Sequence, residues 1–142
     1  MNGPGFIHLH VHSAFSLLEG ALQLETILKL AAEDAQPALG IADTGNLFGA
    51  LEFSEKAVKK GIQPLIGVEL AIDFAAAEER LNERGHVAWS GKSSVVLMAQ
   101  SEEGFSNLSR LVSRAYLEGE NGLARARLDW LSPEALAGLI CL

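Results

Sequence analysis

Apolar strand-like segments alternate along this chain with helix-like segments, and this order constrains the fold more than any other feature. Apolar residues spaced three and four apart predict helices, and short apolar runs bounded by Gly, Pro or polar residues predict strands. The predicted strands cover residues 6–12, 38–43, 64–72, 95–99 and 139–142, and the predicted helices cover residues 24–33, 51–60 and 102–117. Such alternation is typical of an α/β fold in which helices cover a mostly parallel sheet.

The remaining segments carry loop and turn signals. Residues 75–84 are expected to form a helical or loose insert, and residues 119–127 a loop. Ser132 is expected to cap a short helix that has Pro133 at its first position. The chain stops inside the apolar run 139–142, and an exposed strand edge promotes aggregation, so we expect it to be the first part of a larger protein.

Composition excludes several classes of protein. The 142 residues are 49% hydrophobic, which is enough for one domain with a core. No apolar run reaches the roughly 20 residues that cross a bilayer, and the single Cys141 supports no disulfide framework, so we expect a soluble cytoplasmic protein without membrane contact. The net charge of −7 disfavours a main nucleic-acid grip, and Lys56, Lys59 and Lys60 are interpreted as a solvated helix face.

Three of the four histidines, His8, His10 and His12, stand on alternate positions of the run at residues 6–12. In a β-strand, residues two apart point to the same face, so these imidazoles are expected to share one side of the strand. Imidazole is the commonest nitrogen ligand of divalent metals in proteins. The same alternation is also compatible with the polar face of a half-buried strand.

Further candidate ligands stand where predicted strands end. In parallel α/β folds, sites gather at the carboxyl ends of strands. Strand ends are expected to supply His10, His12, Asp43 and Glu69, and the turn after the first strand supplies Glu19. Imidazoles together with carboxylates suit a site for divalent cations, which can activate water and stabilise charge on a phosphoryl group.

Simpler interpretations of some of these residues stay open. Asp43 can be a turn residue that accepts a backbone hydrogen bond, and Glu19 can be an exposed turn acid. Ser13 and Ser16 can cap the turn or hydrogen-bond a ligand. Glu69 in an apolar strand is harder to explain by packing, because a buried carboxylate needs a partner. Neither a nucleophile elbow for a Ser-His-Asp triad nor a phosphate-binding Gly-rich loop with Lys is found in the sequence.

Four stretches, residues 6–21, 43–53, 61–69 and 103–115, together resemble a known family. They are similar, in the same order, to the polymerase-and-histidinol-phosphatase (PHP) domain, in the version found in alpha subunits of bacterial DNA polymerase III. The resemblance implies that residues 1–142 form the N-terminal part of an irregular (β/α)7 barrel. It also implies that the rest of the barrel and the polymerase domains lie outside this chain.

The resemblance also implies a cluster of zinc, manganese or magnesium ions at the strand ends. Matched motif by motif, its metal positions, either ligands or residues that hold them, are His10, His12, Glu19, Asp43 and Glu69, with His8, Ser16 and Thr44 beside them. The family often has Asp at position 19, His at position 44, and His where Ser93 and Ser94 stand. Because hydroxyls are weaker ligands than imidazoles, we expect a degenerate metal site and no catalytic residue in this segment.

Three functions are therefore considered. The leading hypothesis is a PHP segment of a replicative polymerase alpha subunit, a DNA-directed DNA polymerase. In it the segment supports the polymerase core and docks the proofreading exonuclease subunit and other holoenzyme subunits, and contact with DNA goes through the full protein. The second is a metal-dependent phosphoesterase, either with 3′–5′ proofreading activity or of the histidinol-phosphatase type. The third is an error-prone paralogue of the polymerase subunit.

Overall fold

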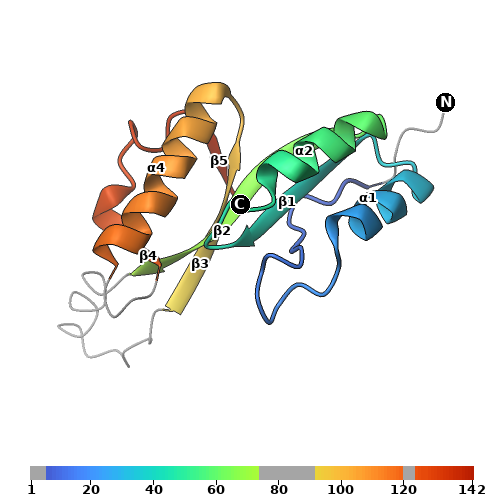
Figure 1. The fold of residues 1–142 in the computed structure, drawn as a ribbon. Coiled ribbons are helices and arrows are strands. Elements are labelled where there is room, and N and C mark those ends of the chain that lie inside the picture. Colours follow the sequence, from blue (N-terminus) through green and yellow to red (C-terminus); the bar gives the residue numbers. More distant parts are fainter. Residues whose placement is uncertain (1–5, 74–91, 120–123) are drawn as a thin grey trace.

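The computed structural model describes residues 6–73, 92–119 and 124–142 (Figure 1). Three α-helices, a short 3-10 helix and five strands lie in these ranges. In chain order they are α1 (Leu24–Glu33), β1 (Ala38–Thr44), α2 (Ala50–Lys59), β2 (Gln63–Asp73), β3 (Lys92–Ala99), α4 (Glu102–Glu118), β4 (Arg125–Arg127), η2 (Leu128–Trp130) and β5 (Leu139–Cys141). In the described residues, none of the helices has the length and apolar character needed to span a bilayer.

The five strands form one sheet in which β2 is central. β1 and β4 pair in parallel with successive parts of β2, whereas β3 pairs with β2, and β5 with β3, in antiparallel fashion. The α/β fold is thus confirmed, but the sheet is mixed rather than mostly parallel. The difference has a simple reason, because an apolar run predicts a buried strand without fixing its direction.

The helices and most strands occur where the sequence predicts them. α1 has the predicted bounds, and α2 ends before Gly61, which adopts a left-handed φ of 72°. The Ser101 hydroxyl accepts a hydrogen bond of 3.1 Å from the Gly104 amide and so caps α4.

Two predicted segments differ from the structure, and a third cannot be compared with it. The predicted loop at 119–127 contains β4, and the Ser132 hydroxyl accepts a bond from the Ala135 amide at a turn rather than at a helix. The expected insert at 75–84 lies outside the described residues.

The predicted first strand, residues 6–12, is wrong as a regular strand. The segment runs beside β1 with a single bridge, between Val11 and Ile41, and Leu9 is 40% exposed. Its path depends on Gly40, whose amide donates to the His8 carbonyl at 2.7 Å. A Cβ at Gly40 would lie 2.5 Å from the Leu9 carbonyl oxygen, so a larger residue there would push the segment away.

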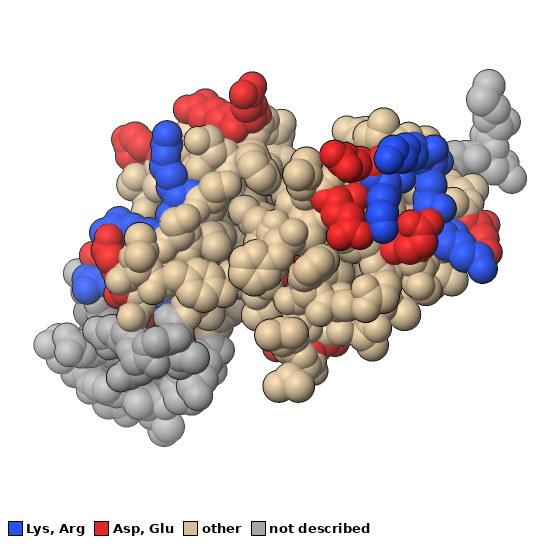
Figure 2. Space-filling view, in the orientation of Figure 1, with Lys and Arg blue, Asp and Glu red and all other residues tan. Residues whose placement is uncertain are grey.

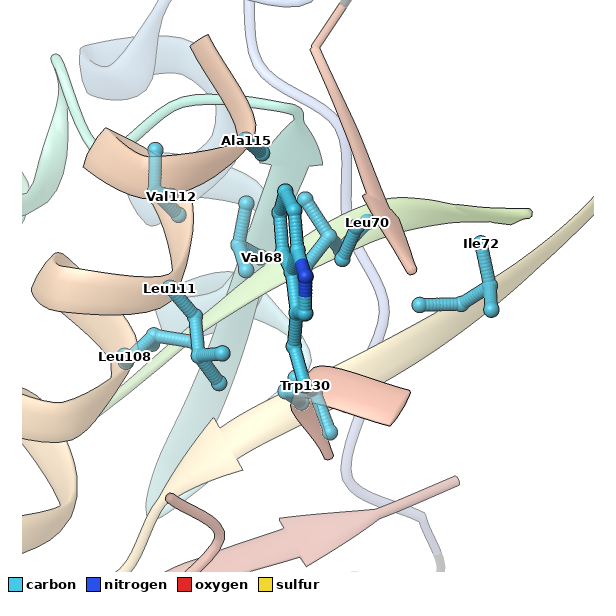
Figure 3. Packing of buried hydrophobic residues seen from close by; sticks show 10 residues of the cluster. Val68, Leu70, Ile72, Leu108, Leu111, Val112, Ala115 and Trp130 are labelled. Atoms are coloured by element: carbon cyan, nitrogen blue, oxygen red, sulfur yellow. The ribbon is translucent and has the colours of Figure 1, made fainter. Parts of the chain in front are cut away.

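The helices pack on one face of the sheet. Alternate residues of β2, from Ile66 to Ile72, point to this face. Val68, Leu70 and Ile72 pack against α4 and Trp130 (Figure 3), and Ile66 packs against the cluster that α1 and α2 form with β1. The larger cluster consists of Val68, Leu70, Ile72, Leu97, Leu108, Leu111, Val112, Ala115, Ala126 and Trp130.

The other face of the sheet carries a small apolar cluster next to polar side chains. Ala42, Val96 and Met98 are buried there. Strand register places Thr44 beside Glu69, and Glu69 beside Val96, so these residues share this face. The polar end of this face is the place where the candidate ligands gather.

The lysines at the end of α2 lie on a charged surface, as the prediction of a solvated helix face requires. Lys56 and Lys60 both contact the Glu25 carboxylate of α1, at 3.7 and 3.0 Å, and Lys56 also contacts Glu52 at 2.8 Å. Figure 2 shows basic and acidic side chains interleaved over these two helices. Because these lysines are paired with acids, they form no open basic patch for nucleic acid.

Candidate metal centre

Three side chains from two segments meet at the polar end of the sheet. The Nε2 atoms of His10 and His12 lie 2.8 and 2.9 Å from the same carboxylate oxygen, Oε2 of Glu69, and 3.0 Å from each other. The histidines come from the segment beside β1, and Glu69 comes from β2. In the part of the chain that the structure describes, these three residues form the group of His and acidic side chains able to hold a metal ion.

Hydrogen bonds cannot account for all three contacts between these atoms. If both Nε2 atoms carry a proton, both can donate to Glu69, but they then face each other as two donors. If only one carries a proton, the other faces the carboxylate oxygen as a second acceptor. At most two of the three contacts are hydrogen bonds in either case, so one pair of polar atoms lies close together without a hydrogen bond between them.

A divalent cation would fit between these three atoms. An octahedral ion such as Mg²⁺, with ligand atoms about 2.0–2.1 Å away, places neighbouring ligand atoms about 2.8–3.0 Å from each other. The three edges of the triangle, 2.8, 2.9 and 3.0 Å, fall in this range. Two imidazole nitrogens and one carboxylate oxygen are also a donor set that zinc and other divalent metals accept.

Glu69 is held from its other side by a residue that sequence reasoning did not assign. The Ser94 hydroxyl donates to Oε1 of Glu69 at 2.5 Å. Burial raises the pKa of the Glu69 carboxyl, but the hydrogen bonds from Ser94, His10 and His12 outweigh it, so this pKa lies below its usual value. The carboxylate therefore stays ionised and able to bind a cation at neutral pH.

Glu19 lies at the edge of the cluster. Its Oε2 atom is 3.8 Å from Nδ1 of His12, and it accepts a short hydrogen bond from the Thr44 hydroxyl. The side chain of Glu19 is 52% exposed. Glu19 thus contacts the outer nitrogen of a candidate ligand, and Thr44 orients it.

Asp43 lies apart from these side chains, in a buried hydrogen-bond network. Its Oδ1 accepts from the Ser13 amide and the Ser16 hydroxyl, both at 2.6 Å, and its Oδ2 accepts from the Ser13 hydroxyl at 2.8 Å. Asp43, Ser13 and Ser16 are all buried. The Ser16 hydroxyl also accepts a bond from the Thr44 amide, so the network fastens the 13–20 turn to the end of β1.

The separation of Asp43 from the cluster follows from strand geometry. Adjacent residues of a strand point to opposite faces. Thr44 pairs with Glu69 in register and shares its face, so Asp43 points to the other face. The structure thus brings His10, His12 and Glu69 together, with Glu19 beside them and Asp43 on the other face of the strand.

His8 also stands outside the cluster. Its ring packs edge-on against Phe6, with centroids 4.8 Å apart, and its amide donates to the Gln36 side chain. The alternation of three histidines therefore yields two convergent imidazoles, in a segment that is not a regular strand.

The sequence of this chain is similar to known proteins of one family. A family model described as the PHP domain matches residues 8–142. Among curated relatives, the chain is 49% identical over 116 residues to the DNA polymerase III subunit alpha of Caulobacter vibrioides and 47% identical over 117 residues to that of Thermus aquaticus. These alignments cover 82% and 80% of this chain but 10% and 9% of the relatives, so the chain spans about a tenth of their length.

Two solved structures share the fold. An amidohydrolase from Chromobacterium violaceum aligns with a TM-score of 0.54 and 24% identity, over 78% of this chain and 33% of its own. A proposed metal-dependent phosphoesterase from Bifidobacterium adolescentis aligns with a TM-score of 0.51 and 18% identity, over 82% of this chain and 36% of its own. With the family match over nearly all of its length, the chain belongs to the PHP domain family.

Proposed function

We propose that this chain is the N-terminal part of the PHP domain of a bacterial replicative DNA polymerase III alpha subunit. The observation that carries the proposal is the 47–49% identity to two such subunits over four fifths of the chain. A third alpha subunit, from Treponema pallidum, is 39% identical over 96% of the chain. The family match supports the broader PHP assignment, and these relatives support the narrower one.

The role proposed for the segment is mainly structural. It supports the polymerase core and contributes to the docking of the proofreading exonuclease subunit and other holoenzyme subunits. Contact with DNA goes through the rest of the alpha chain, since the net charge of −7 and the paired lysines offer no evident phosphate grip.

A zinc, manganese or magnesium ion is proposed to bind between His10, His12 and Glu69. Glu19 orients His12 through its outer nitrogen, and Asp43 acts indirectly by fixing the turn that follows His12. When bound, such a cation supplies a Lewis acid that stabilises negative charge on an oxygen ligand. The chain's own residues hold it at a partly exposed position, with the side chains of His10 and His12 44% and 24% exposed.

The polymerase proposal is tested by primer extension with the full-length protein that carries this segment. Three forms are compared: the parent, a His10→Ala/His12→Ala double variant and the matched control His8→Ala, which removes a histidine outside the cluster. Nucleotide incorporation is expected within about twofold of the parent in both variants, since exposed substitutions away from the reacting groups have small effects. Absence of template-dependent synthesis by the parent would overturn the identity. A total loss in the folded double variant alone would overturn the structural role.

A metal-dependent phosphoesterase is the second candidate. The observation that favours it is the triangle of two imidazoles and a carboxylate, a donor set that suits hydrolytic metal sites. The test is Mn²⁺-dependent release of nucleotides from a 3′-labelled oligonucleotide, and of phosphate from a phosphomonoester, by the full-length protein. Activity that His8→Ala keeps and the double variant loses would support it, and equal activity in all three forms would reject it.

A further inference from the structure

The two oxygens of the Glu69 carboxylate have different partners. Oε2 faces the Nε2 atoms of His10 and His12, and Oε1 accepts the hydrogen bond from the Ser94 hydroxyl. Ser94 stands on β3 opposite Ala71, two positions along from the partner of Glu69, and so points to the same face of the sheet. One oxygen is thus directed at the imidazoles while the other is held by a donor.

We propose that Ser94 is a positioning residue that makes Glu69 a one-oxygen ligand of the cation at His10 and His12; this inference rests on the metal site of the proposed function. The terminal torsion of a Glu side chain is broad, so an unrestrained carboxylate rotates and can offer both oxygens to an ion. A hydroxyl proton on Oε1 opposes that rotation. It also leaves the Oε2 lone pair as the one directed at the ion.

The chemistry of Ser94 suits this role better than that of a ligand. A neutral hydroxyl is a weak metal ligand but a good donor to a carboxylate, and such charge-assisted bonds are short, about 2.5–2.7 Å. The 2.5 Å contact has the length of a bond of this kind. Groups that orient a metal ligand in this way typically change metal affinity about 10–100-fold when they are removed.

A purely structural role for Ser94 predicts a different behaviour. Ser94 is exposed near the start of β3, so its hydroxyl has little buried structure to support. If the bond served folding, its loss would lower the stability of the metal-free protein and leave the affinity for a cation unchanged. The positioning role predicts the reverse.

The experiment measures Co²⁺ binding to the full-length protein by the visible absorption of the bound ion and by competition with a chelator. Ser94→Ala and Ser94→Val remove the hydroxyl, and Ser94→Thr restores it on a side chain of the same shape as Val. Ser93→Ala is the matched control, because Ser93 is the adjacent serine of β3 and points to the opposite face. Glu69→Ala reports loss of the ligand itself.

We expect Ser94→Ala and Ser94→Val to bind Co²⁺ at least about 10-fold more weakly, with a changed absorption spectrum. Ser94→Thr and Ser93→Ala should match the parent in Co²⁺ affinity and in absorption spectrum. Melting temperatures in EDTA should be equal in all forms.

Parental affinity and spectrum in Ser94→Ala and Ser94→Val, alongside loss of binding in Glu69→Ala, would overturn the inference and keep the metal site. Absence of saturable Co²⁺ binding by the parent would overturn both. Primer extension is measured on the same preparations. If the parent fails to extend a primer, the polymerase proposal is overturned, but the Co²⁺ results still test the role of Ser94.

Discussion

Two carboxylates on neighbouring strands, Asp43 of β1 and Glu69 of β2, have opposite kinds of environment. Asp43 is buried and accepts bonds from three donors, all supplied by Ser13 and Ser16. Glu69 is partly exposed, and its Oε2 shares one small space with two imidazole nitrogens, in contacts that protons cannot all satisfy. The Asp43 carboxylate is hydrogen-bonded by donors of the protein. Oε2 of Glu69 instead faces a position that a cation would fit.

This difference separates a residue that stabilises from a residue that binds. A satisfied buried network rigidifies the structure around it, and losing part of it leaves buried donors without partners. A partly exposed cluster of lone pairs contributes little to folding by itself and becomes stabilising when a cation is present. Substitutions in the Asp43 network should therefore change stability, and substitutions in the cluster around Glu69 should change metal binding.

The largest expected effect is that of Asp43→Ala. Loss of the carboxylate leaves the Ser13 amide and two hydroxyls without their acceptor, which should lower local stability by about 3 kcal/mol. Hydrogen exchange of the 13–20 turn and β1 in the full-length protein should then be about 100-fold faster. Asp43→Asn should show a smaller change, and Glu33→Ala, an exposed acid of α1, almost none. Unchanged protection in Asp43→Ala would contradict the stabilising role of this network.

Removal of the cation should have the next largest effect. At a free Zn²⁺ concentration about 100 times its dissociation constant, bound metal adds about 2.7 kcal/mol to the stability of the state that binds it. Hydrogen exchange of the His10–His12 segment and β2 should therefore slow on addition of zinc and recover with EDTA. His10→Ala, His12→Ala and Glu69→Ala should abolish the zinc effect and leave exchange in EDTA as in the parent. A zinc effect that persists in all three variants would place the binding elsewhere.

Gly40→Ala should lower both the stability of β1 and the zinc affinity of the histidine cluster. Its added Cβ would meet the Leu9 backbone, so the segment that carries His10 and His12 must shift. Overpacking of this kind costs about 1–3 kcal/mol. Calorimetric titration with zinc should show weaker binding, and exchange of β1 should be faster. The control Gly61→Asn replaces a glycine whose added Cβ would meet nothing within 4 Å, and Asn tolerates its left-handed φ. If Gly40→Ala bound zinc as the parent does, the close approach would not be needed to place the histidines.

Thr44→Ala should have the smallest effect. It removes the hydroxyl that donates to Glu19, at an exposed position. Stability should change by less than about 0.5 kcal/mol, and zinc affinity by a few-fold at most, because Glu19 contacts the outer nitrogen of His12 rather than the cluster itself. Thr44→Ser keeps the hydroxyl and should match the parent. A loss of binding as large as that of Glu69→Ala would move Thr44 and Glu19 to the centre of the site.

Local pattern predicted most of the fold. α1, with Ile27, Leu28 and Ala31 on its buried face, follows from helical spacing, and β1 and β2 follow from short, mainly apolar runs. Two features depended on tertiary contacts instead. The direction of β3 comes from its pairing with β2, and the course of the segment before His12 comes from its close approach to Gly40.

The candidate site was predictable in part. Alternation brings His10 and His12 to one side, and an acid within an apolar strand singles out Glu69. The choice between Asp43 and Thr44 requires the register of β1 against β2, which no local pattern contains. The family resemblance marks Ser94 only as a position where an imidazole is often found, whereas its hydroxyl donates to the Glu69 carboxylate.

The most direct test is a diffraction measurement on crystals of the full-length protein soaked in zinc, with data collected on both sides of the zinc absorption edge. The account predicts an anomalous difference peak about 2.0–2.1 Å from Nε2 of His10, Nε2 of His12 and Oε2 of Glu69, with none at Asp43. A zinc-bound crystal without a peak at this triangle, or with the ion coordinated by Asp43, would contradict it.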